Sequence, residues 1–384
     1  AAFEFATAGR IVFGAGCRSR LGTELARLGR RPLVVTGGGQ RHADWLPPLF
    51  ATAGLVATPL TVAGEPTIEQ AERAAALARD AGCDVVVGVG GGSCIDAAKA
   101  VAALAMQPHG PLDYLEVIGA GRPLDVEPLP CVAVPTTAGT GAEVTRNAVL
   151  GCPTARVKVS LRHPAMLPRL AIVDPELTLS LPRAVTAATG LDALTQLIEP
   201  FVSPRANPLT DGFCREGLAR IQWALPAVLE TPSDLAARAA MSLASLLGGL
   251  ALANAGLGAV HGLAGPLGGM LEAPHGSLCG LLLPGVMAAN IASLTRKGDW
   301  APAVERYREV ARILTGSPEA KPIDAVNWTR RLLATAGLPR LATYGMTEAA
   351  IPEAIDKAKR ASSMKANPVT LGDEQLATIL HDAC

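Results

Sequence analysis

Short apolar runs alternate with helical stretches between residues 32 and 175 of the chain. The runs are rich in β-branched residues, and each ends at or just before Gly, Ala, Pro, Thr or Asp, as strands that end in loops do. This alternation predicts an α/β domain with a parallel sheet and crossover helices, in which ligands bind at the carboxyl ends of the strands. The predicted strands cover residues 32–36, 56–62, 85–89, 131–135 and 170–173.

Two further segments of this region have patterns of their own. Residues 67–81 carry apolar side chains at helical spacing after Thr67, which predicts a crossover helix with this threonine as its N-cap. Residues 147–161 show β-branched alternation around Pro153, which predicts an extra hairpin on the sheet domain.

The strand pattern stops after Pro175, and long helical segments rich in Ala, Leu and Gly follow from Pro182 to the C-terminus. We place the domain boundary at Pro182, with an α/β domain over residues 1–182 and an all-helical domain over residues 183–384. Small residues are unusually frequent in the segment 245–267, which predicts helices packed closely at the centre of a bundle.

Length, charge and cysteine content narrow the class of protein. The 384 residues exceed the usual size of one hydrophobic core, which favours two domains. Lys and Arg together number 34, as do Asp and Glu, so no net charge attracts nucleic acid or a membrane surface, and we expect a small-molecule partner. The longest apolar stretches, such as residues 278–289, are interrupted by Gly and Pro and fall short of a bilayer span. Residues 1–13 show no secretory signal, and the eight scattered cysteines are interpreted as reduced thiols in the cytoplasm.

A glycine turn lies between the predicted strand 85–89 and the helix that follows it. The turn consists of Gly90, Gly91, Gly92 and Ser93. Glycines let the backbone approach a pyrophosphate, and the unpaired N–H groups and dipole of a helix N-terminus favour the anion. The usual G-x-G-x-x-G pattern is absent, and a tight turn without a ligand has the same composition, so the turn alone is weak evidence.

A second loop follows the predicted strand 131–135 and carries three hydroxyl side chains around two glycines. Thr136, Thr137 and Thr140 lie within five residues of one another. Their hydroxyls can hydrogen-bond phosphate, ribose or a nicotinamide amide. The alternative is a threonine-rich loop that caps the next helix.

With a later histidine segment, the two loops resemble the iron-containing alcohol dehydrogenase family over most of residues 10–290. The resemblance implies a dinucleotide-binding α/β domain followed by an all-helical domain, the dehydroquinate synthase-like arrangement, with the cofactor in the cleft. It implies that NAD or NADP is bound by Gly91, Gly92, Ser93, Asp96, Thr136, Thr137, Thr140 and Lys158.

Three positions of the implied cofactor site carry alternatives or departures. Many family members have an Asp at the end of the first sheet strand, where this chain has Gly37, so NADP is permitted and Arg41 is available to its 2′-phosphate. Asp96 has an alternative role as a first-turn helix acid, and Lys158 as a solvated strand lysine.

The resemblance also implies a divalent metal, Fe²⁺ or Zn²⁺, bound by one Asp and three His in the helical domain. Asp192 and Gln196 match the first two ligands, and their spacing of four places both on one helix face. Gln196 replaces a histidine with a neutral and weaker ligand. His261 and His275 match the remaining ligands, and Gly265 replaces a further histidine near the nicotinamide. The alternative for the two histidines is burial with backbone partners.

Two mechanisms are open for hydride transfer between the cofactor and an alcohol or carbonyl substrate. In the first, the metal acts as a Lewis acid. In the second, which has a precedent in the related, metal-independent maleylacetate reductases, His261 or His275 stabilises the alkoxide and supplies the proton. Both histidines are therefore candidate catalytic residues.

Two other classes of protein remain as alternatives. A dehydroquinate synthase-like cyclase is disfavoured because the segments around Asp192 and His261 are too apolar for a phosphorylated sugar acid. A non-catalytic nucleotide-binding protein is disfavoured because it has no reason to keep Asp192, His261 and His275 together. By resemblance we also expect a homodimer or a larger homo-oligomer.

Overall fold

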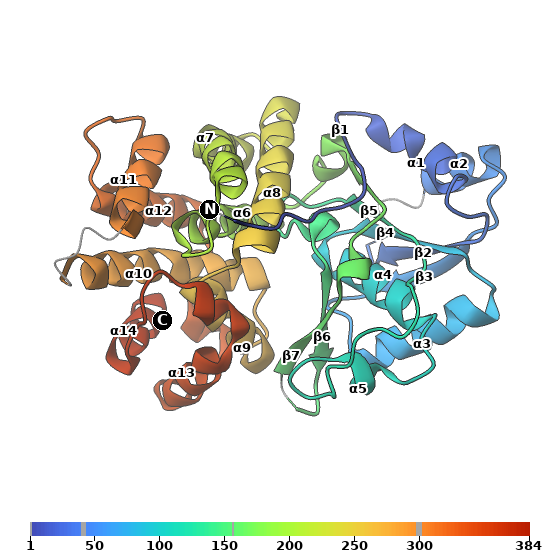
Figure 1. The fold of residues 1–384 in the computed structure, drawn as a ribbon. Coiled ribbons are helices and arrows are strands. Elements are labelled where there is room, and N and C mark those ends of the chain that lie inside the picture. Colours follow the sequence, from blue (N-terminus) through green and yellow to red (C-terminus); the bar gives the residue numbers. More distant parts are fainter. Residues whose placement is uncertain (1, 40–43, 156, 297–301) are drawn as a thin grey trace. The chain divides into compact units, whose positions relative to one another are not determined.

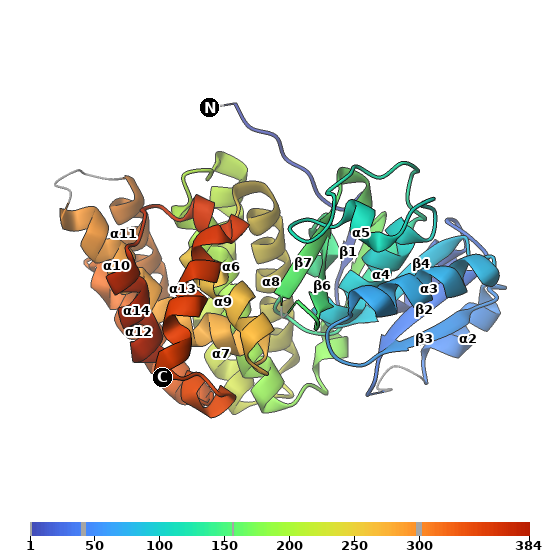
Figure 2. The same ribbon diagram turned by 90° about the horizontal axis from the view of Figure 1, so that it is seen from below.

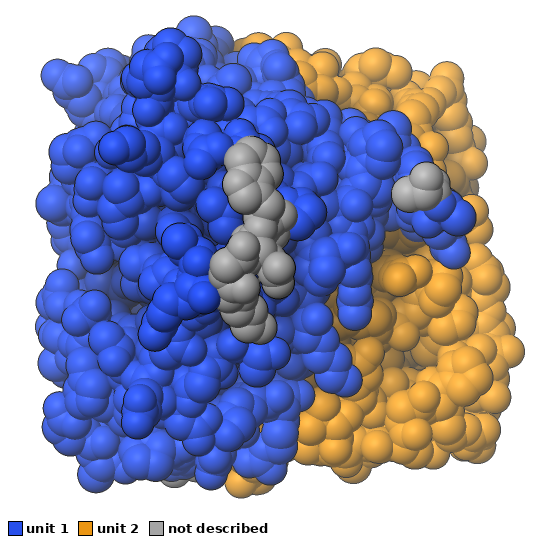
Figure 3. Space-filling view, turned by 60° about the vertical axis from the view of Figure 1, so that its left-hand side comes forward, with its two compact units in different colours: residues 1–6, 138–140, 179–384 blue, residues 7–137, 141–178 orange. Residues whose placement is uncertain are grey.

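The chain divides into two compact units in the computed structural model, which describes residues 2–39, 44–155, 157–296 and 302–384 (Figure 3). Unit 1 consists of Ala1–Ala6, Ala138–Thr140 and Leu179–Cys384. Unit 2 consists of Thr7–Thr137 and Gly141–Thr178. Unit 2 contains a parallel sheet, and unit 1 is helical, so the predicted fold class is confirmed.

A six-stranded parallel sheet forms the centre of unit 2 (Figure 1). All five predicted strands are confirmed, although β3 begins two residues later than expected. The short edge strand that pairs with β8 was not predicted from the sequence. In spatial order the strands are β1 (Ile11–Phe13), β8 (Leu170–Val173), β5 (Cys131–Pro135), β4 (Val85–Gly90), β2 (Pro32–Gly37) and β3 (Thr58–Val62).

Helices cover both faces of this sheet, which explains why its central strands are apolar throughout. Leu33 and Val35 of β2 pack in one core with α3 and α4, whereas Val34 packs in a second core with α1 and α2. Figure 2 shows α3 and α4 running along the strands of this sheet. Thr67 caps α3 as predicted, since its hydroxyl accepts a hydrogen bond from the Gln70 N–H. The helices of unit 2 are α1 (Leu21–Leu25), α2 (Leu46–Thr52), α3 (Ile68–Asp80), α4 (Gly92–Leu104) and α5 (Pro111–Tyr114).

The predicted hairpin is present as a separate two-stranded antiparallel sheet. Strand β6 (Asn147–Cys152) pairs with β7 (Val157–Arg162) along its whole length. Ala148 and Leu150 of β6 are buried in the same core as α3 and α4. The hairpin thus extends the side of unit 2 that carries these two helices.

Unit 1 is built from long helices with buried apolar faces. Its helices are α6 (Arg183–Val202), α7 (Pro208–Glu230), α8 (Leu235–Ala255), α9 (Ala259–Met270), α10 (His275–Arg296), α11 (Pro302–Thr315), α12 (Pro322–Ala336), α13 (Ile351–Arg360) and α14 (Asp373–Ala383). Close packing depends on glycines where these helices meet. A Cβ added at Gly276 of α10 would lie 2.2 Å from the Ala188 carbonyl oxygen of α6, so no larger residue fits. This contact brings the start of α10 against the middle of α6.

Helices α8 and α10 are long and apolar enough to cross a membrane by length and composition alone. About two thirds of the apolar window of α8 and 61% of that of α10 are buried inside the structure, as in core helices. These apolar segments are longer than predicted, because Gly and Pro were expected to interrupt them. Pro284, however, lies inside α10.

Candidate functional site

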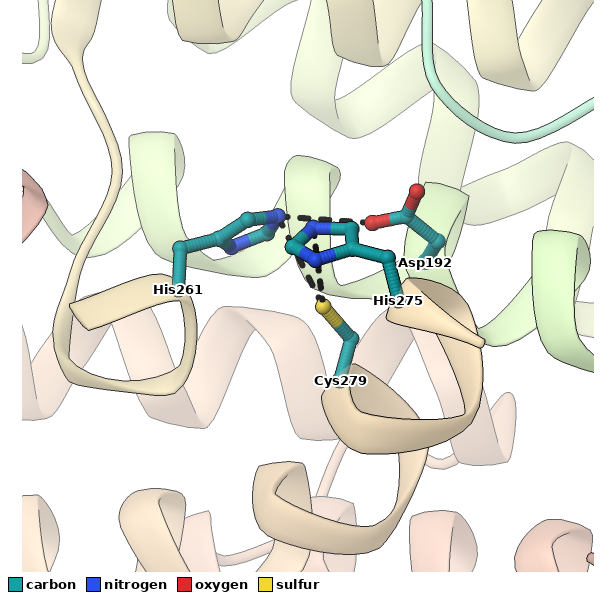
Figure 4. A group of neighbouring side chains, drawn as sticks. All are labelled: Asp192, His261, His275 and Cys279. Carbon is teal, nitrogen blue, oxygen red and sulfur yellow. Dashed lines mark hydrogen bonds and ion pairs between the residues drawn. The ribbon is translucent and has the colours of Figure 1, made fainter. Parts of the chain in front are cut away.

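Four side chains from three helices of unit 1 form a group that is able to hold a metal ion. Asp192 comes from α6, His261 from α9, and His275 and Cys279 from α10 (Figure 4). One ligand atom from each lies within 4.8 Å of the others. The predicted ligands Asp192, His261 and His275 are therefore brought together, and Cys279 joins them.

The distances within the group are those of direct neighbours. His261 Nε2 lies 3.3 Å from Asp192 Oδ1. The Cys279 Sγ lies 3.6 Å from His275 Nε2 and 3.8 Å from His261 Nε2. Asp192 and Cys279 are almost completely buried, and His261 is 7% exposed, so water has little access to these groups.

Local helix geometry explains how the group is assembled. His275 and Cys279 are four residues apart on α10, as Asp192 and Gln196 are on α6, so each pair shares one helix face. The close approach at Gly276 then places the face of α10 against that of α6. The spacing of four between His275 and Cys279 is visible in the sequence and indicates a shared helix face, but Cys279 was not predicted as a site residue.

Two buried oxygens of α6 have no hydrogen-bond partner among the described residues, namely Asp192 Oδ1 and Gln196 Oε1. The His261 Nε2 lies 3.3 Å from Asp192 Oδ1, at ion-pair distance. An unpaired buried carboxylate oxygen is costly unless a cation or a hydrogen-bond donor compensates it. The residues present therefore fit a divalent cation, which would take oxygen and nitrogen ligands of this kind.

Glu199 fixes the orientation of His261. The Glu199 Oε2 lies 2.6 Å from His261 Nδ1, and its Oε1 accepts a hydrogen bond from the Val260 N–H at 2.7 Å. A carboxylate bonded to the outer nitrogen of a histidine is the usual support of a metal ligand, because it leaves the other nitrogen facing the ion. Glu199 was not predicted as a site residue, although this glutamate lies seven residues after Asp192, on the same face of α6.

The charges in this group shift the pKa values of both histidines. Burial acts to lower the pKa of His261, but the negative charges of Cys279 and Glu199 and the contact with Asp192 outweigh it, so this pKa is raised. For His275, the charge of Cys279 is the largest influence and raises the pKa against the effect of burial. The group thus attracts positive charge, whether from protons or from a metal ion.

In unit 2, the glycine turn brings several predicted cofactor residues together at the carboxyl edge of the sheet. Gly91 is the N-cap of α4, so the N–H groups of Gly92 and Ser93 lie in the first turn, where helices have no internal acceptors. A Cβ at Gly91 would lie 3.3 Å from Thr137 Cγ2, and the Thr136 N–H donates to the Gly90 carbonyl oxygen. Both predicted loops therefore meet at this helix N-terminus.

Gly37 also reaches this turn, but other predicted cofactor residues have protein partners or lie elsewhere. A Cβ at Gly37 would be 3.5 Å from the Cys94 Sγ. Thr140 belongs to the short segment assigned to unit 1. Arg41, the residue predicted for a 2′-phosphate, lies outside the described residues.

Asp96 and Lys158 both form ion pairs within unit 2. Asp96 Oδ1 lies 2.9 Å from the buried Lys99 Nζ, and its Oδ2 accepts a hydrogen bond from the Val149 N–H. Lys158 pairs with Glu65 at 2.6 Å. Asp96 therefore joins α4 to β6. The structural role expected for it from the sequence was that of an acid in the first turn of a helix.

Both halves of the chain match models of one protein family. Residues 8–175 match the family model described as iron-containing alcohol dehydrogenase, and residues 186–384 match the model of the C-terminal part of the Fe-containing alcohol dehydrogenase family. The resemblance found in the sequence is thereby confirmed.

Individual relatives match over nearly the whole chain. Long-chain-alcohol dehydrogenase 1 of Geobacillus thermodenitrificans is 37% identical, with 89% of this chain and 88% of the relative covered. The 4-hydroxybutyrate dehydrogenase of Cupriavidus necator is 36% identical, with 92% of each chain covered. Among solved structures, a 1,3-propanediol oxidoreductase matches with a TM-score of 0.91 and 31% identity over 100% of both chains. The sulfoacetaldehyde reductase from Bifidobacterium kashiwanohense in complex with NAD⁺ matches with a TM-score of 0.87 and 29% identity, covering 100% of this chain and 99% of that one.

Proposed function

The chain belongs to the iron-containing alcohol dehydrogenase family, and we propose that it transfers a hydride between NAD(P) and an alcohol or carbonyl substrate. The observation that carries this proposal is the group of Asp192, His261, His275 and Cys279, in which Asp192 Oδ1 is buried and has no hydrogen-bond partner among the described residues. A vestigial or non-catalytic fold would have no reason to keep such a group together.

Asp192, His261 and His275 are the proposed ligands of a divalent cation, Fe²⁺ or Zn²⁺, and Gln196 stands at the position matched to the third histidine. When bound, such a cation supplies Lewis acidity toward the alcohol or carbonyl oxygen. Glu199 acts as a positioning residue, since its bond to His261 Nδ1 holds the imidazole with Nε2 toward the group. Burial of these side chains excludes water, which strengthens their electrostatic effect on a reacting oxygen.

The proposed nicotinamide site lies on the glycine turn and the threonine loop. Gly91, Gly92 and Ser93 offer backbone N–H groups to the pyrophosphate at the N-terminus of α4. Thr136, Thr137 and Thr140 offer hydroxyls to the remaining groups of the cofactor, and Lys158 offers its ammonium group to a ribose hydroxyl by exchanging its partner Glu65. Gly37 places no carboxylate beside a 2′-phosphate, so we expect NADPH to be accepted as well as NADH. In this proposal, residues 1–182 bind the nucleotide and residues 183–384 provide the metal and substrate site.

The substrate class is proposed from the relatives. Their names include 1,3-propanediol, 4-hydroxybutyrate, 1-propanol and methanol dehydrogenases, all of which act at a primary alcohol carbon. We therefore expect primary alcohols and the corresponding aldehydes. A homo-oligomer in the cytoplasm remains our prediction for the assembly and location, and size-exclusion chromatography with light scattering tests the assembly.

A metal-free version of the same reaction is the second candidate, and the neutral Gln196 at a position matched to histidine favours it. In that version His261, held by Glu199, or His275 supplies the proton to the alkoxide. Metal analysis of the purified protein, before and after incubation with Fe²⁺ or Zn²⁺, separates the two versions.

The test of the function is oxidation of NADH and NADPH with a panel of straight-chain aldehydes, with and without added metal. We expect turnover by the wild-type protein and its loss in His275→Ala. Turnover that requires no metal supports the second candidate, and no turnover with any aldehyde or alcohol rejects hydride transfer altogether.

A further inference from the structure

We propose that Cys279 is a direct metal ligand and completes an Asp–His–His–Cys site that prefers zinc to iron. The inference rests on the proposed function only in assuming that the site binds a divalent cation. It concerns a residue that the resemblance did not include, because the implied ligand set contains one Asp and three His. In this chain Gln196 replaces the third histidine, and the thiolate of Cys279 serves as the fourth ligand.

Two of the distances between ligand atoms match the edges of a tetrahedron around one metal ion, and a third is close to them. Bonds of about 2.0–2.1 Å to nitrogen and oxygen and about 2.3 Å to sulfur put neighbouring ligands roughly 3.3–3.6 Å apart. His261 Nε2 and Asp192 Oδ1 are 3.3 Å apart, and Cys279 Sγ is 3.6 Å from His275 Nε2. The 3.8 Å from Cys279 Sγ to His261 Nε2 is slightly longer than this range. A thiol hydrogen bond would be weak at such distances, whereas one ion satisfies all four atoms.

The surroundings of Cys279 differ from those of Cys131, another buried cysteine. Cys131 lies in an apolar core of unit 2, among alanine, valine and leucine side chains. Cys279 is 0% exposed and lies beside two imidazoles and the Asp192 carboxylate. Reactive and metal-binding thiols lie among polar and charged groups of this kind, whereas structural thiols are packed against apolar side chains.

The chemistry of sulfur supports the same assignment. Thiolate is a soft ligand, and soft ligands favour Zn²⁺ over Mg²⁺, Mn²⁺ and Fe²⁺.

X-ray absorption spectroscopy of the full-length protein loaded with zinc tests this ligand directly. We expect one sulfur scatterer at about 2.3 Å from the zinc in the wild-type protein. The Cys279→Ala and Cys279→Ser variants should lose this scatterer. The matched control is Cys214→Ala, which removes another buried thiol of unit 1, from α7, and should retain it. Cobalt-loaded samples give an independent signal, a thiolate-to-cobalt charge-transfer band that Cys279→Ser should abolish.

The metal preference provides a second measurement. Competition between Zn²⁺ and Fe²⁺ should favour zinc in the wild-type protein, and this preference should fall about tenfold or more in Cys279→Ser, because only a thiolate distinguishes the ions by softness.

The outcomes separate this inference from the proposed function. A zinc site with nitrogen and oxygen scatterers alone overturns the role of Cys279 and leaves hydride transfer intact. A sulfur scatterer that persists in Cys279→Ala, or a wild-type protein that binds neither zinc nor cobalt, overturns it as well. A wild-type sulfur scatterer without turnover of any carbonyl substrate supports the ligand and rejects the function. The wild-type spectrum alone shows whether a sulfur atom binds the zinc, even if a Cys279 variant fails to fold.

Discussion

The glycine turn of unit 2 and the ligand group of unit 1 are both candidate binding sites, but they are built from different parts of the chain. The turn uses backbone groups of consecutive residues at the N-terminus of α4. The ligand group uses side chains from three helices that span 88 residues from Asp192 to Cys279, counting both ends. A backbone site tolerates many side-chain changes, whereas a side-chain site depends on each member. The difference predicts how each site responds to mutation.

The largest effect is expected from Asp192→Ala, which removes the only carboxylate of the ligand group. We expect loss of bound metal and a fall in kcat/KM of roughly 1000-fold, because a metal ion supplies several kcal/mol of transition-state stabilisation. Metal analysis and steady-state kinetics measure both effects. The control is Asp211→Asn, at a buried aspartate of α7 that pairs with Arg306 and should leave metal content unchanged. Full metal content in Asp192→Ala would reject the ligand group.

Glu143, in the threonine loop, should make stability depend on pH. Burial raises the pKa of its carboxyl from 4.5 to about 7, against smaller opposing effects of its backbone N–H and of Lys99. Between these values the folded protein holds a proton that the unfolded chain has lost, so stability falls as pH rises. The fall is about 3 kcal/mol for the shift of roughly 2.5 units. Urea unfolding from pH 4.5 to 7.5 should show this slope, and Glu143→Gln should remove it. A similar loss of slope in Glu127→Gln, at an exposed acid, would contradict the assignment.

Glu199→Gln tests whether the ligand group depends on the support behind it. We expect metal affinity to fall about 10- to 100-fold, as for other carboxylates that orient a ligating histidine. In the metal-free protein the pKa of His261 should also fall, because the negative charge of Glu199 helps to raise it. Calorimetric titration with zinc and NMR titration of His261 measure the two effects. Glu199→Asp, which keeps the charge, should retain more affinity, and equal losses in both variants would indicate a packing defect instead.

Gly91→Asp tests the backbone site by placing a negative charge beside the proposed pyrophosphate position. We expect the KM for NADH and NADPH to rise at least about tenfold, since about 1.4 kcal/mol of repulsion is sufficient for that change. Metal content should stay the same. Gly91→Ala, whose Cβ meets only the Thr137 side chain, should have a smaller effect. Equal KM values in wild type and Gly91→Asp would place the pyrophosphate elsewhere.

The smallest expected effect is a gain in metal affinity. Gln196→His restores an imidazole at the matched position, and we expect affinity for zinc or iron to rise about tenfold. Gln196→Leu is the control, because it has a similar size and no ligand atom. It should not strengthen metal binding and should slightly stabilise the fold by removing a buried unpaired oxygen. Competition with a metal chelator measures both affinities.

Local patterns predicted most of the fold. The β-branched runs, the cap at Thr67 and the hairpin around Pro153 are properties of neighbouring residues, and the structure confirms them. Strand β1 was missed because three residues are too few to show a period. The apolar segments of α8 and α10 were predicted too short, because a proline or glycine destabilises a buried helix less than the sequence pattern implied.

The candidate site was predicted less completely because the residues that contact one another there are distant in sequence. The pairs of Asp96 with Val149 and of Lys158 with Glu65 join residues 53 and 93 positions apart, and no local pattern reveals them. Glu199 and Cys279 carried a local signal, since both share a helix face with a predicted ligand. Only the packing of α9 and α10 against α6 shows that these faces meet.

The glycines around the ligand group also determine how the protein can be engineered. Gly276 has no space for a Cβ, because that atom would overlap the backbone of α6, so a library at this position would return mostly unfolded variants. A Cβ at Gly265, on the same helix as His261, meets no atom within 4 Å among the described residues. A side chain can therefore be introduced at residue 265, close to the ligand group along α9, without a clash at its Cβ.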